Sequence, residues 1–208
     1  MSKPIIVIGN GGHASVLIEI LIAKQREIEG FTAPHEEDSR FNIPYLGMDD
    51  VISTYSPTEI ELVLGLGTIG ISELRKTIFE QFVAKGYTFA KVIHPTAIVS
   101  PSVKLGHGVQ IMAGAVLQTN GKVADNTIIN TGAVIDHDSV IGSHVHIAPG
   151  SILSGGVAIG NGCHIGTGTT IIQGIEIGEE TVVGAGSVVL RNIGDRKTAY
   201  GVPAKEVK

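Results

Sequence analysis

The sequence predicts a small N-terminal α/β domain followed by a parallel β-helix. The β-helix is indicated by a six-residue period that runs without insertion over residues 94–189, with Val, Leu or Ile at the sixth position of every repeat. The fourth position is nearly always small or β-branched, as at Ala115, Ser139 and Cys163. Side chains alternate along a strand, so positions four and six point inward while position five points outward. Apolar pairs separated by Gly, Asn and Asp turns are typical of a coiled solenoid.

Residues 4–93 lack this period and alternate strands with helices. A buried strand at 5–8 leads through a glycine turn into a helix expected from about Ala14 to Gln25. Strands are expected at 28–33 and 61–64, and a second helix from about Ser72 to Lys85. The apolar stripes of the two helices are expected to be Val16, Leu17, Ile20 and Leu21, and Leu74, Ile78, Phe82 and Val83. This order of elements favours a Rossmann-like parallel unit.

We therefore expect three segments: residues 1–93, the β-helix at 94–190, and a tail at 191–208. The net charge is −5 without a Lys/Arg run, so nucleic acid is not an expected partner. No apolar stretch approaches eighteen residues and no secretory signal begins the chain, so membrane insertion is not expected. The single cysteine, Cys163, indicates a reducing compartment, and we expect a cytoplasmic protein.

The first turn carries a possible phosphate-binding motif. Gly9, Gly11 and Ala14 satisfy G-x-G-x-x-A between a strand and a helix, where glycines let the backbone approach a phosphate. The NAD-binding form needs an acidic residue after the second strand, and Thr32-Ala33-Pro34 stands there. Hydride chemistry is therefore disfavoured, and the diphosphate of another nucleotide fits better. A turn that only connects strand to helix is the alternative.

The order of motifs resembles one enzyme family. Gly-x-Gly-Gly-His at the first turn, a small α/β unit, a hexapeptide helix and Gly201-Val202-Pro203-Ala204-Lys205 resemble the sugar O-/N-acyltransferases. These include sialic acid O-acetyltransferases and N-acetyltransferases of nucleotide-linked 4-amino sugars, and the run 130–138 most resembles the bacillosamine and perosamine type. The resemblance implies a left-handed β-helix that transfers an acetyl group from acetyl-CoA to the C4 amine of a UDP- or GDP-linked sugar, for surface glycan or glycoprotein biosynthesis. The family often has adjacent aspartates after the second strand, where this chain has Thr32-Ala33.

His137 is the candidate general base, because Asp136 and Asp138 flank it and a neighbouring carboxylate favours the imidazolium. The resemblance implies that Asp138 orients His137, and that His146 donates a hydrogen bond to the acetyl-CoA thioester. It further implies a pantetheine groove formed by Gly155, Thr167 and Ala185. The residues expected to contact the nucleotide sugar are Gly9, Gly11, Gly12, His13, Gly67 and Asn130. A corner histidine that pairs with aspartate without a catalytic role is the alternative.

The spacing of the histidines adds two expectations and raises one alternative site chemistry. His146 and His164 are eighteen residues apart, one full coil, and are expected to stack on an outer face. His137 and His146 are nine residues apart, half a coil, so a site that uses both needs two chains, and we expect a homotrimer. A zinc site built from His137, His144, His146 and His164 is disfavoured beside the Asp-His-Asp run, and no metal is expected. A sugar O-acetyltransferase and a non-catalytic trimeric scaffold remain alternatives.

Overall fold

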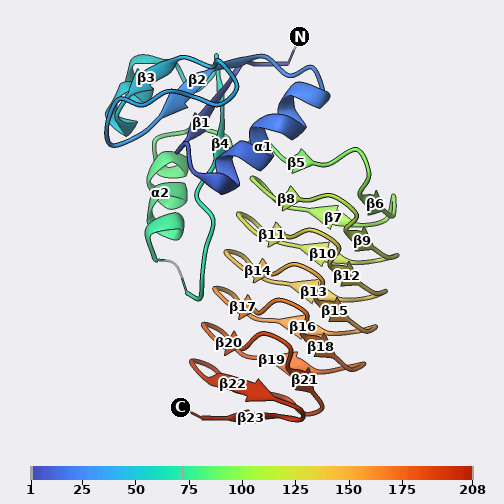
Figure 1. Ribbon diagram of the computed structural model, residues 1–208. Coiled ribbons are helices and arrows are strands. Elements are labelled where there is room, and N and C mark those ends of the chain that lie inside the picture. Colours follow the sequence, from blue (N-terminus) through green and yellow to red (C-terminus); the bar gives the residue numbers. More distant parts are fainter. Residues whose placement is uncertain (1, 72, 208) are drawn as a thin grey trace. The chain divides into compact units, whose positions relative to one another are not determined.

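The structure, a computed structural model, describes residues 2–71 and 73–207 (Figure 1). The chain divides into two compact units. Among the described residues, the first unit comprises 2–67 and 73–95, and the second comprises 68–71 and 96–207. The predicted first residue of the second helix, Ser72, lies outside the described residues. None of the described helices is long and apolar enough to cross a membrane.

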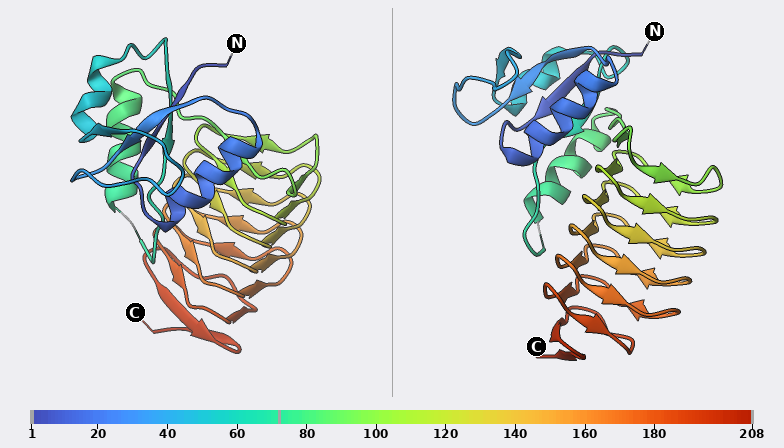
Figure 2. Two further views of the ribbon diagram at one scale, coloured as in Figure 1. Left: turned by 45° about the horizontal axis from the view of Figure 1, so that its top comes forward. Right: turned by 45° about the vertical axis from the view of Figure 1, so that its right-hand side comes forward.

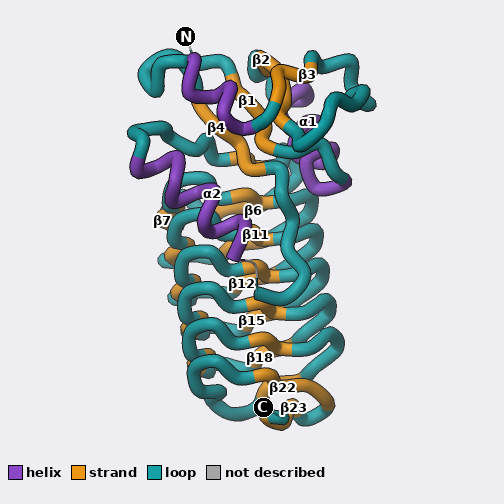
Figure 3. Tube along the Cα trace, turned by 90° about the vertical axis from the view of Figure 1, so that its left-hand side faces the viewer, coloured by secondary structure: helices purple, strands orange, loops and turns teal. Residues whose placement is uncertain are grey.

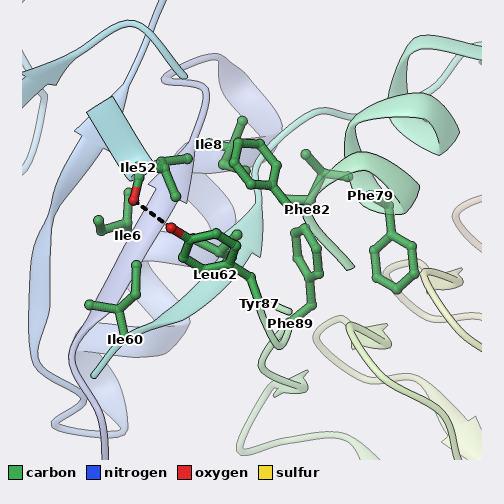
Figure 4. Close-up of a cluster of buried hydrophobic side chains, with 10 residues drawn as sticks. Ile6, Ile8, Ile52, Ile60, Leu62, Phe79, Phe82, Tyr87 and Phe89 are labelled. Carbon is green, nitrogen blue, oxygen red and sulfur yellow. Dashed lines mark hydrogen bonds between the residues drawn. The ribbon is translucent and has the colours of Figure 1, made fainter. Parts of the chain in front are cut away.

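The first unit is a parallel sheet in the order β3-β2-β1-β4, with helices joined to its strands. Its strands are β1 (Ile5–Ile8), β2 (Ile28–Thr32), β3 (Tyr45–Gly47), β4 (Glu61–Leu64) and β5 (Val92–Ile93), and its helices are α1 (Gly12–Ala23), η1 (Asp49–Thr54) and α2 (Glu73–Ala84). β1 is buried throughout because it pairs on both sides, with β2 and with β4. The cluster in Figure 4 packs Ile6, Ile8 and Leu62 of the sheet against Phe79 and Phe82 of α2.

The buried faces of the two helices differ from the predicted stripes. In α1, Leu17, Ile20 and Leu21 are buried as predicted, but the prediction for Val16 is wrong, since Val16 is exposed and Ile18 is buried. The helix is apolar around most of its circumference, so the sequence alone does not determine which side faces the sheet. In α2, Phe82 is buried, whereas Leu74 and Val83 are exposed, contrary to prediction. Arg75 and Phe79 occupy the inner face instead.

The second unit is a parallel β-helix of short strands that stack into three faces (Figures 2 and 3). Face 1 consists of β8 (Gln110–Ile111), β11 (Ile128–Ile129), β14 (His146–Ile147), β17 (His164–Ile165), β20 (Val182–Val183), β22 (Thr198–Gly201) and β23 (Ala204–Glu206). Face 2 consists of β6 (Ile98–Val99), β9 (Val116–Leu117), β12 (Val134–Ile135), β15 (Ile152–Leu153), β18 (Thr170–Ile171) and β21 (Val188–Val189). Face 3 consists of β7 (Lys104–Leu105), β10 (Lys122–Val123), β13 (Val140–Ile141), β16 (Ala158–Ile159) and β19 (Glu176–Ile177). The chain visits the faces in the order 1, 2, 3, and residues eighteen apart pair in register, as His146 does with His164.

The hexapeptide positions have the structural roles that the period predicts. Sixth-position residues such as Ile147 and Ile165 are fully buried, and so is the fourth-position Cys163. Burial raises the pKa of the Cys163 thiol to about 11. From the third repeat on, the third position lies in the left-handed region of φ, which favours Gly, Asn and Asp. The residues other than glycine that hold this conformation at third positions are Asn120, Asn126, Asp138, His144 and Glu180.

The C-terminal segment continues the β-helix. β22 pairs in parallel with β20, and β23 folds back antiparallel on β22. β22 and β23, which come from the segment that the sequence set apart as a tail, thus supply the end of face 1 (Figure 1).

Candidate active site

His137 and Asp138 lie at the corner between faces 2 and 3. His137 Nδ1 is 2.8 Å from Asp138 Oδ2, and both side chains are about half exposed. Asp138 has a φ of 59°, so the backbone at this third position is left-handed although the residue is not glycine. The corner therefore presents an ion pair to solvent at a place where a simple turn needs none.

The pair is held in one orientation by its neighbours. Asp136 Oδ1 accepts a hydrogen bond from the His137 backbone N–H at 2.8 Å, and Asn120 Nδ2 donates to Asp138 Oδ1 at 3.2 Å. The hydrogen bond that His137 donates to Asp138, followed by the charge of Asp136, raises the pKa of His137 above its usual value. The hydrogen bonds from His137 and Asn120 lower the pKa of Asp138. With Nδ1 bound to the carboxylate, Nε2 is the ring nitrogen of His137 that a ligand could approach.

Sequence reasoning missed Asn120. It precedes Asp138 by eighteen residues, one full coil, and it shares the same hexapeptide position and left-handed backbone. The coil length was the signal that would have identified it, because residues eighteen apart stack directly on one another.

Gly155 lies one coil after His137 and contacts it. A Cβ atom at Gly155 would lie 2.5 Å from Cε1 and 2.6 Å from Nε2 of His137. The absence of a side chain at residue 155 thus makes room for the imidazole. Of the residues that the resemblance implied for the pantetheine groove, the structure brings Gly155 to His137 and leaves Thr167 and Ala185 at another corner, between faces 1 and 2.

His146 projects from the outer side of β14 on face 1, the face opposite the His137 corner. Its exposure is only 8%, and its Nδ1 is 2.8 Å from the hydroxyl and 3.1 Å from the carbonyl oxygen of Thr68. The ring meets that of His164 edge-on, with centroids 5.0 Å apart, so the predicted stacking is confirmed. The prediction that a fifth-position residue points outward also holds, but residues 68–71 belong to this unit and Thr68 covers the ring.

Asn130 fixes the proton on His146. Asn130 Oδ1 accepts from the Thr131 backbone N–H at 2.7 Å, so its Nδ2 is turned toward His146 Nε2, 3.0 Å away, and donates to it. In the neutral ring the proton therefore resides on Nδ1, which faces Thr68. Both ring nitrogens are engaged within the chain, and the hydrogen bond to a thioester implied for His146 would have to replace one of these contacts.

The site residues of the β-helix thus form two groups on the two edges of face 2. His137, Asp138 and Gly155 lie on the edge shared with face 3. Asn130, Thr167 and Ala185 lie on the edge shared with face 1, and His146 lies on face 1 itself beside Asn130.

The first unit brings the glycine turn together with the end of β4. Gly9 has a φ of 95° and accommodates the sharp turn after β1, whereas the space beside Gly11 and Gly12 at the start of α1 is open. A Cβ at Gly67 would lie 3.2 Å from the Cβ of His13, so these two residues are neighbours. The turn at Gly9–His13 and the segment at Gly67 therefore form one edge of the unit, at the carboxyl ends of the strands where α/β folds bind ligands.

The end of β4 is held by a residue that the sequence did not single out. Arg75 of α2 is 3% exposed, and its Nη1 donates to the carbonyl oxygens of Leu64 at 3.0 Å and of Leu66. Burial lowers the pKa of Arg75 to about 9. Within residues 2–71 and 73–207, no group of three His, Cys, Asp or Glu side chains is arranged to hold a metal ion.

Comparison with known proteins places this geometry in context. Residues 4–82 match the PglD N-terminal domain, and residues 156–191 match the bacterial transferase hexapeptide family. PerB from Caulobacter crescentus, solved in complex with CoA and GDP-perosamine, is 37% identical over 99% of this chain and 98% of its own, with a TM-score of 0.90. The acetyltransferase domain of PglB from Neisseria gonorrhoeae is 35% identical over 99% of this chain and 100% of its own, with a TM-score of 0.93.

Two further structures bear on the ligands. The same Neisseria domain in complex with acetyl coenzyme A is 34% identical over the full length of both chains, with a TM-score of 0.92. A histidine-to-asparagine variant of the perosamine N-acetyltransferase from Caulobacter crescentus, with CoA and GDP-perosamine, is 36% identical over 99% of this chain and 97% of its own, with a TM-score of 0.91. No curated protein sequence matches the chain significantly.

Proposed function

The chain belongs to the acetyl-CoA-dependent N-acetyltransferases of nucleotide-linked amino sugars, which have a left-handed β-helix, and we propose that it acetylates the C4 amine of a GDP- or UDP-linked 4-amino sugar. The observation that carries the proposal is the His137–Asp138 pair at an exposed corner, where the absence of a side chain at Gly155 leaves room for the imidazole. Its chemistry is that of a general base, in a chain similar over its whole length to an acetyltransferase solved with CoA and a GDP-linked sugar.

His137 acts on the amine in this mechanism. Asp138 holds the proton of Nδ1, so the lone pair of Nε2 is directed at the substrate. The amine nitrogen attacks the thioester carbonyl carbon, forming the C–N bond, and Nε2 takes a proton from the nitrogen. When the tetrahedral intermediate collapses, the C–S bond breaks and the CoA sulfur leaves with the proton returned by the imidazolium. The product is the N-acetylated sugar nucleotide and free CoA.

The outer surface of face 2 supports a trimer as part of this proposal. Fifth-position residues point outward on each face. On face 2 they form a column that is apolar except at Thr170, and its members are Ile98, Val116, Val134, Ile152, Thr170 and Val188. Ile98 and Ile152 are 66% and 46% exposed in the single chain. The matching column on face 3 contains Lys104, Lys122 and Glu176. Apolar surface of this kind favours association between subunits.

Three copies with face 2 toward a common axis would also complete the site. In that packing, the 2–3 edge of each copy meets the 1–2 edge of the next. His137 and Asp138 of one copy would then face the edge of its neighbour that carries Asn130, Thr167 and Ala185. This arrangement supplies acetyl-CoA with a groove between copies, with the base and Gly155 on one wall and Thr167 and Ala185 on the other.

The N-terminal unit is proposed to hold the nucleotide. Gly9, Gly11, Gly12 and His13 surround the open start of α1, which has no acidic residue in its first turn to repel a diphosphate. Acetyl-CoA and sugar nucleotides are both cytoplasmic metabolites, which supports the proposed cytoplasmic location, and the acetylated product would supply surface glycan or glycoprotein synthesis.

The test is a substrate panel. Acetyl-CoA is incubated with GDP- and UDP-linked 4-amino sugars and with sialic acid, and CoA release is followed with a thiol reagent. Because the one cysteine of the chain is buried, the reagent reports CoA alone. We expect turnover with a 4-amino sugar nucleotide and a mass gain of one acetyl group on its nitrogen. Acetylation of sialic acid only would establish an O-acetyltransferase, and acetyl-CoA binding without turnover on any acceptor would favour the scaffold.

A further inference from the structure

The end of β2 carries a carboxylate that comes from elsewhere in the chain. Thr32, the last residue of β2, is fully buried, and its hydroxyl donates to Asp49 Oδ1 at 2.6 Å. Asp49 begins η1 and is partly exposed. The carbonyl oxygen of Thr32 also accepts a hydrogen bond from the backbone N–H of Gly9 at 2.8 Å. Thr32 therefore contacts both the carboxylate of Asp49 and Gly9, the first glycine of the turn motif.

This position has a defined role in nucleotide-binding α/β folds. An acidic side chain at the end of the second strand binds the ribose hydroxyls, while the glycine turn faces the phosphates. The sequence has Thr32-Ala33-Pro34 at that point and offers no acid of its own. The hydrogen bond between Thr32 and Asp49 supplies one from seventeen residues further along the chain.

Asp49 lines a small hollow. Ala33, Pro34, Met48, Asp49 and Asp50 line a space of about 230 Å³. Sites that enclose a whole drug-sized ligand measure about 300–1,000 Å³, so this hollow fits one part of a larger ligand. Met48 is exposed beside it and offers an apolar, polarisable surface to a ring. A carboxylate accepts about four hydrogen bonds, and Thr32 uses one of these positions.

We propose that Asp49 is the nucleoside-recognising residue of the N-terminal unit, accepting two hydrogens from the nucleoside end of the substrate. The inference rests on the proposed function, since it assumes a sugar nucleotide. Two groups of a nucleotide match a carboxylate in this way: the ribose diol, and the adjacent N1–H and N2–H of guanine. The uracil edge does not, because its single N–H stands between two carbonyl acceptors. Thr32 is a positioning residue that holds the carboxylate toward the hollow.

The experiment is titration calorimetry of the full-length protein with GDP and with UDP. In Asp49→Asn the side chain keeps its shape and still accepts from Thr32, but it loses the charge. We expect GDP to bind about 10- to 100-fold more weakly, the usual effect of losing hydrogen bonds to a charged group. Thr32→Val, which frees the carboxylate, should weaken binding about threefold to tenfold. Glu19→Gln removes an equal charge from the exposed side of α1 and should change nothing.

Comparing GDP with UDP shows whether the two donated hydrogens come from the ribose or from the guanine edge. An equal loss for GDP and UDP assigns Asp49 to the ribose, and 2′-deoxy-GDP should then be insensitive to Asp49→Asn. A loss for GDP alone assigns it to the guanine edge. Acetyl-CoA affinity, measured in the same samples, should match wild type and serves as the check on folding. Wild-type affinity of Asp49→Asn for both nucleotides would overturn the inference. A wild-type protein that binds acetyl-CoA but neither nucleotide would overturn the proposed substrate class itself.

Discussion

His137 and His146 are nine residues apart in one coil, yet their surroundings are opposite in kind. His137 is about half exposed, pairs with a carboxylate, and has a raised pKa. His146 is buried, and its two nitrogens contact the neutral groups of Asn130 and Thr68. The corner histidine uses one nitrogen to pair with Asp138, whereas the face histidine uses both nitrogens in contacts within its own chain.

The different surroundings of the two histidines indicate which one is suited to proton transfer. A general base must gain and lose a proton during each turnover, and a neighbouring carboxylate stabilises the charged form that results. The groups of Asn130 and Thr68 that contact His146 are neutral, and the contact with Thr68 links β14 to a residue seventy-eight positions earlier in the chain. We infer that His137 carries the proton and that His146 holds surface residues in place.

Replacement of His137 should have the largest effect. We expect His137→Ala to lower kcat by roughly 10²–10⁴, the usual contribution of a positioned general base, with little change in either KM. The fold should persist because His137 lies at an exposed turn. The measurement is steady-state turnover on the sugar nucleotide that the panel identifies. His107→Ala, at another exposed corner, is the matched control and should keep wild-type kcat. Wild-type kcat in His137→Ala would refute a base at this corner.

Gly155→Ala tests whether the position of His137, and not only its presence, matters. The added Cβ would lie within 2.6 Å of Nε2 and force the imidazole to move. We expect kcat to fall roughly tenfold to a hundredfold, because small displacements of a catalytic group cost this much. Gly194→Ala, where the new atom meets nothing within 4 Å, is the control. Equal kcat in the two variants would mean that the imidazole has room to adjust and that Gly155 serves another purpose.

Much of the β-helix was predictable from the sequence because its contacts follow from a single number. Residues eighteen apart stack, so the pairing of His146 with His164, the inward position of Cys163 and the outward direction of His146 all follow from the repeat. The same number would have identified Asn120 as the partner of Asp138. The roles of the site residues remain predictions, since they depend on ligands and neighbouring copies.

The contacts that the sequence did not predict join residues whose separation follows no repeat. Thr68 reaches His146 from a connection between β4 and α2, and Asp49 reaches Thr32 across a loop, and neither pairing leaves a spacing signal. The helix stripes failed for a related reason. Val16 and Leu74 are apolar and at helical spacing, but α1 is apolar around most of its circumference, and the inner face of α2 is occupied by Arg75 and Phe79.

Asp138→Asn tests whether the carboxylate partner of His137 raises the pKa of the base. The hydrogen bond that His137 donates to Asp138 is the largest cause of the raised pKa of His137, so replacing the carboxylate acceptor with a neutral amide should lower that pKa. A base works when neutral, so activity rises with pH through this pKa. In Asp138→Asn the acid limb of the kcat profile should move to lower pH, while the plateau falls about tenfold because the ring is no longer oriented. An unmoved limb would show that the group titrating in the profile is not His137.

Thr68→Val should have the smallest effect and addresses the other histidine. The variant keeps the backbone carbonyl that faces Nδ1 of His146 but removes the hydroxyl at 2.8 Å. One hydrogen bond is worth about 1 kcal/mol, so we expect an approximately fivefold rise in the KM for acetyl-CoA as the ring loosens. Thr77→Val, on the exposed side of α2, is the control. Because His146 does not carry the proton in this mechanism, the acid limb of the kcat profile should stay at its wild-type pH. A shift of that limb in Thr68→Val would reverse the assignment of the two histidines.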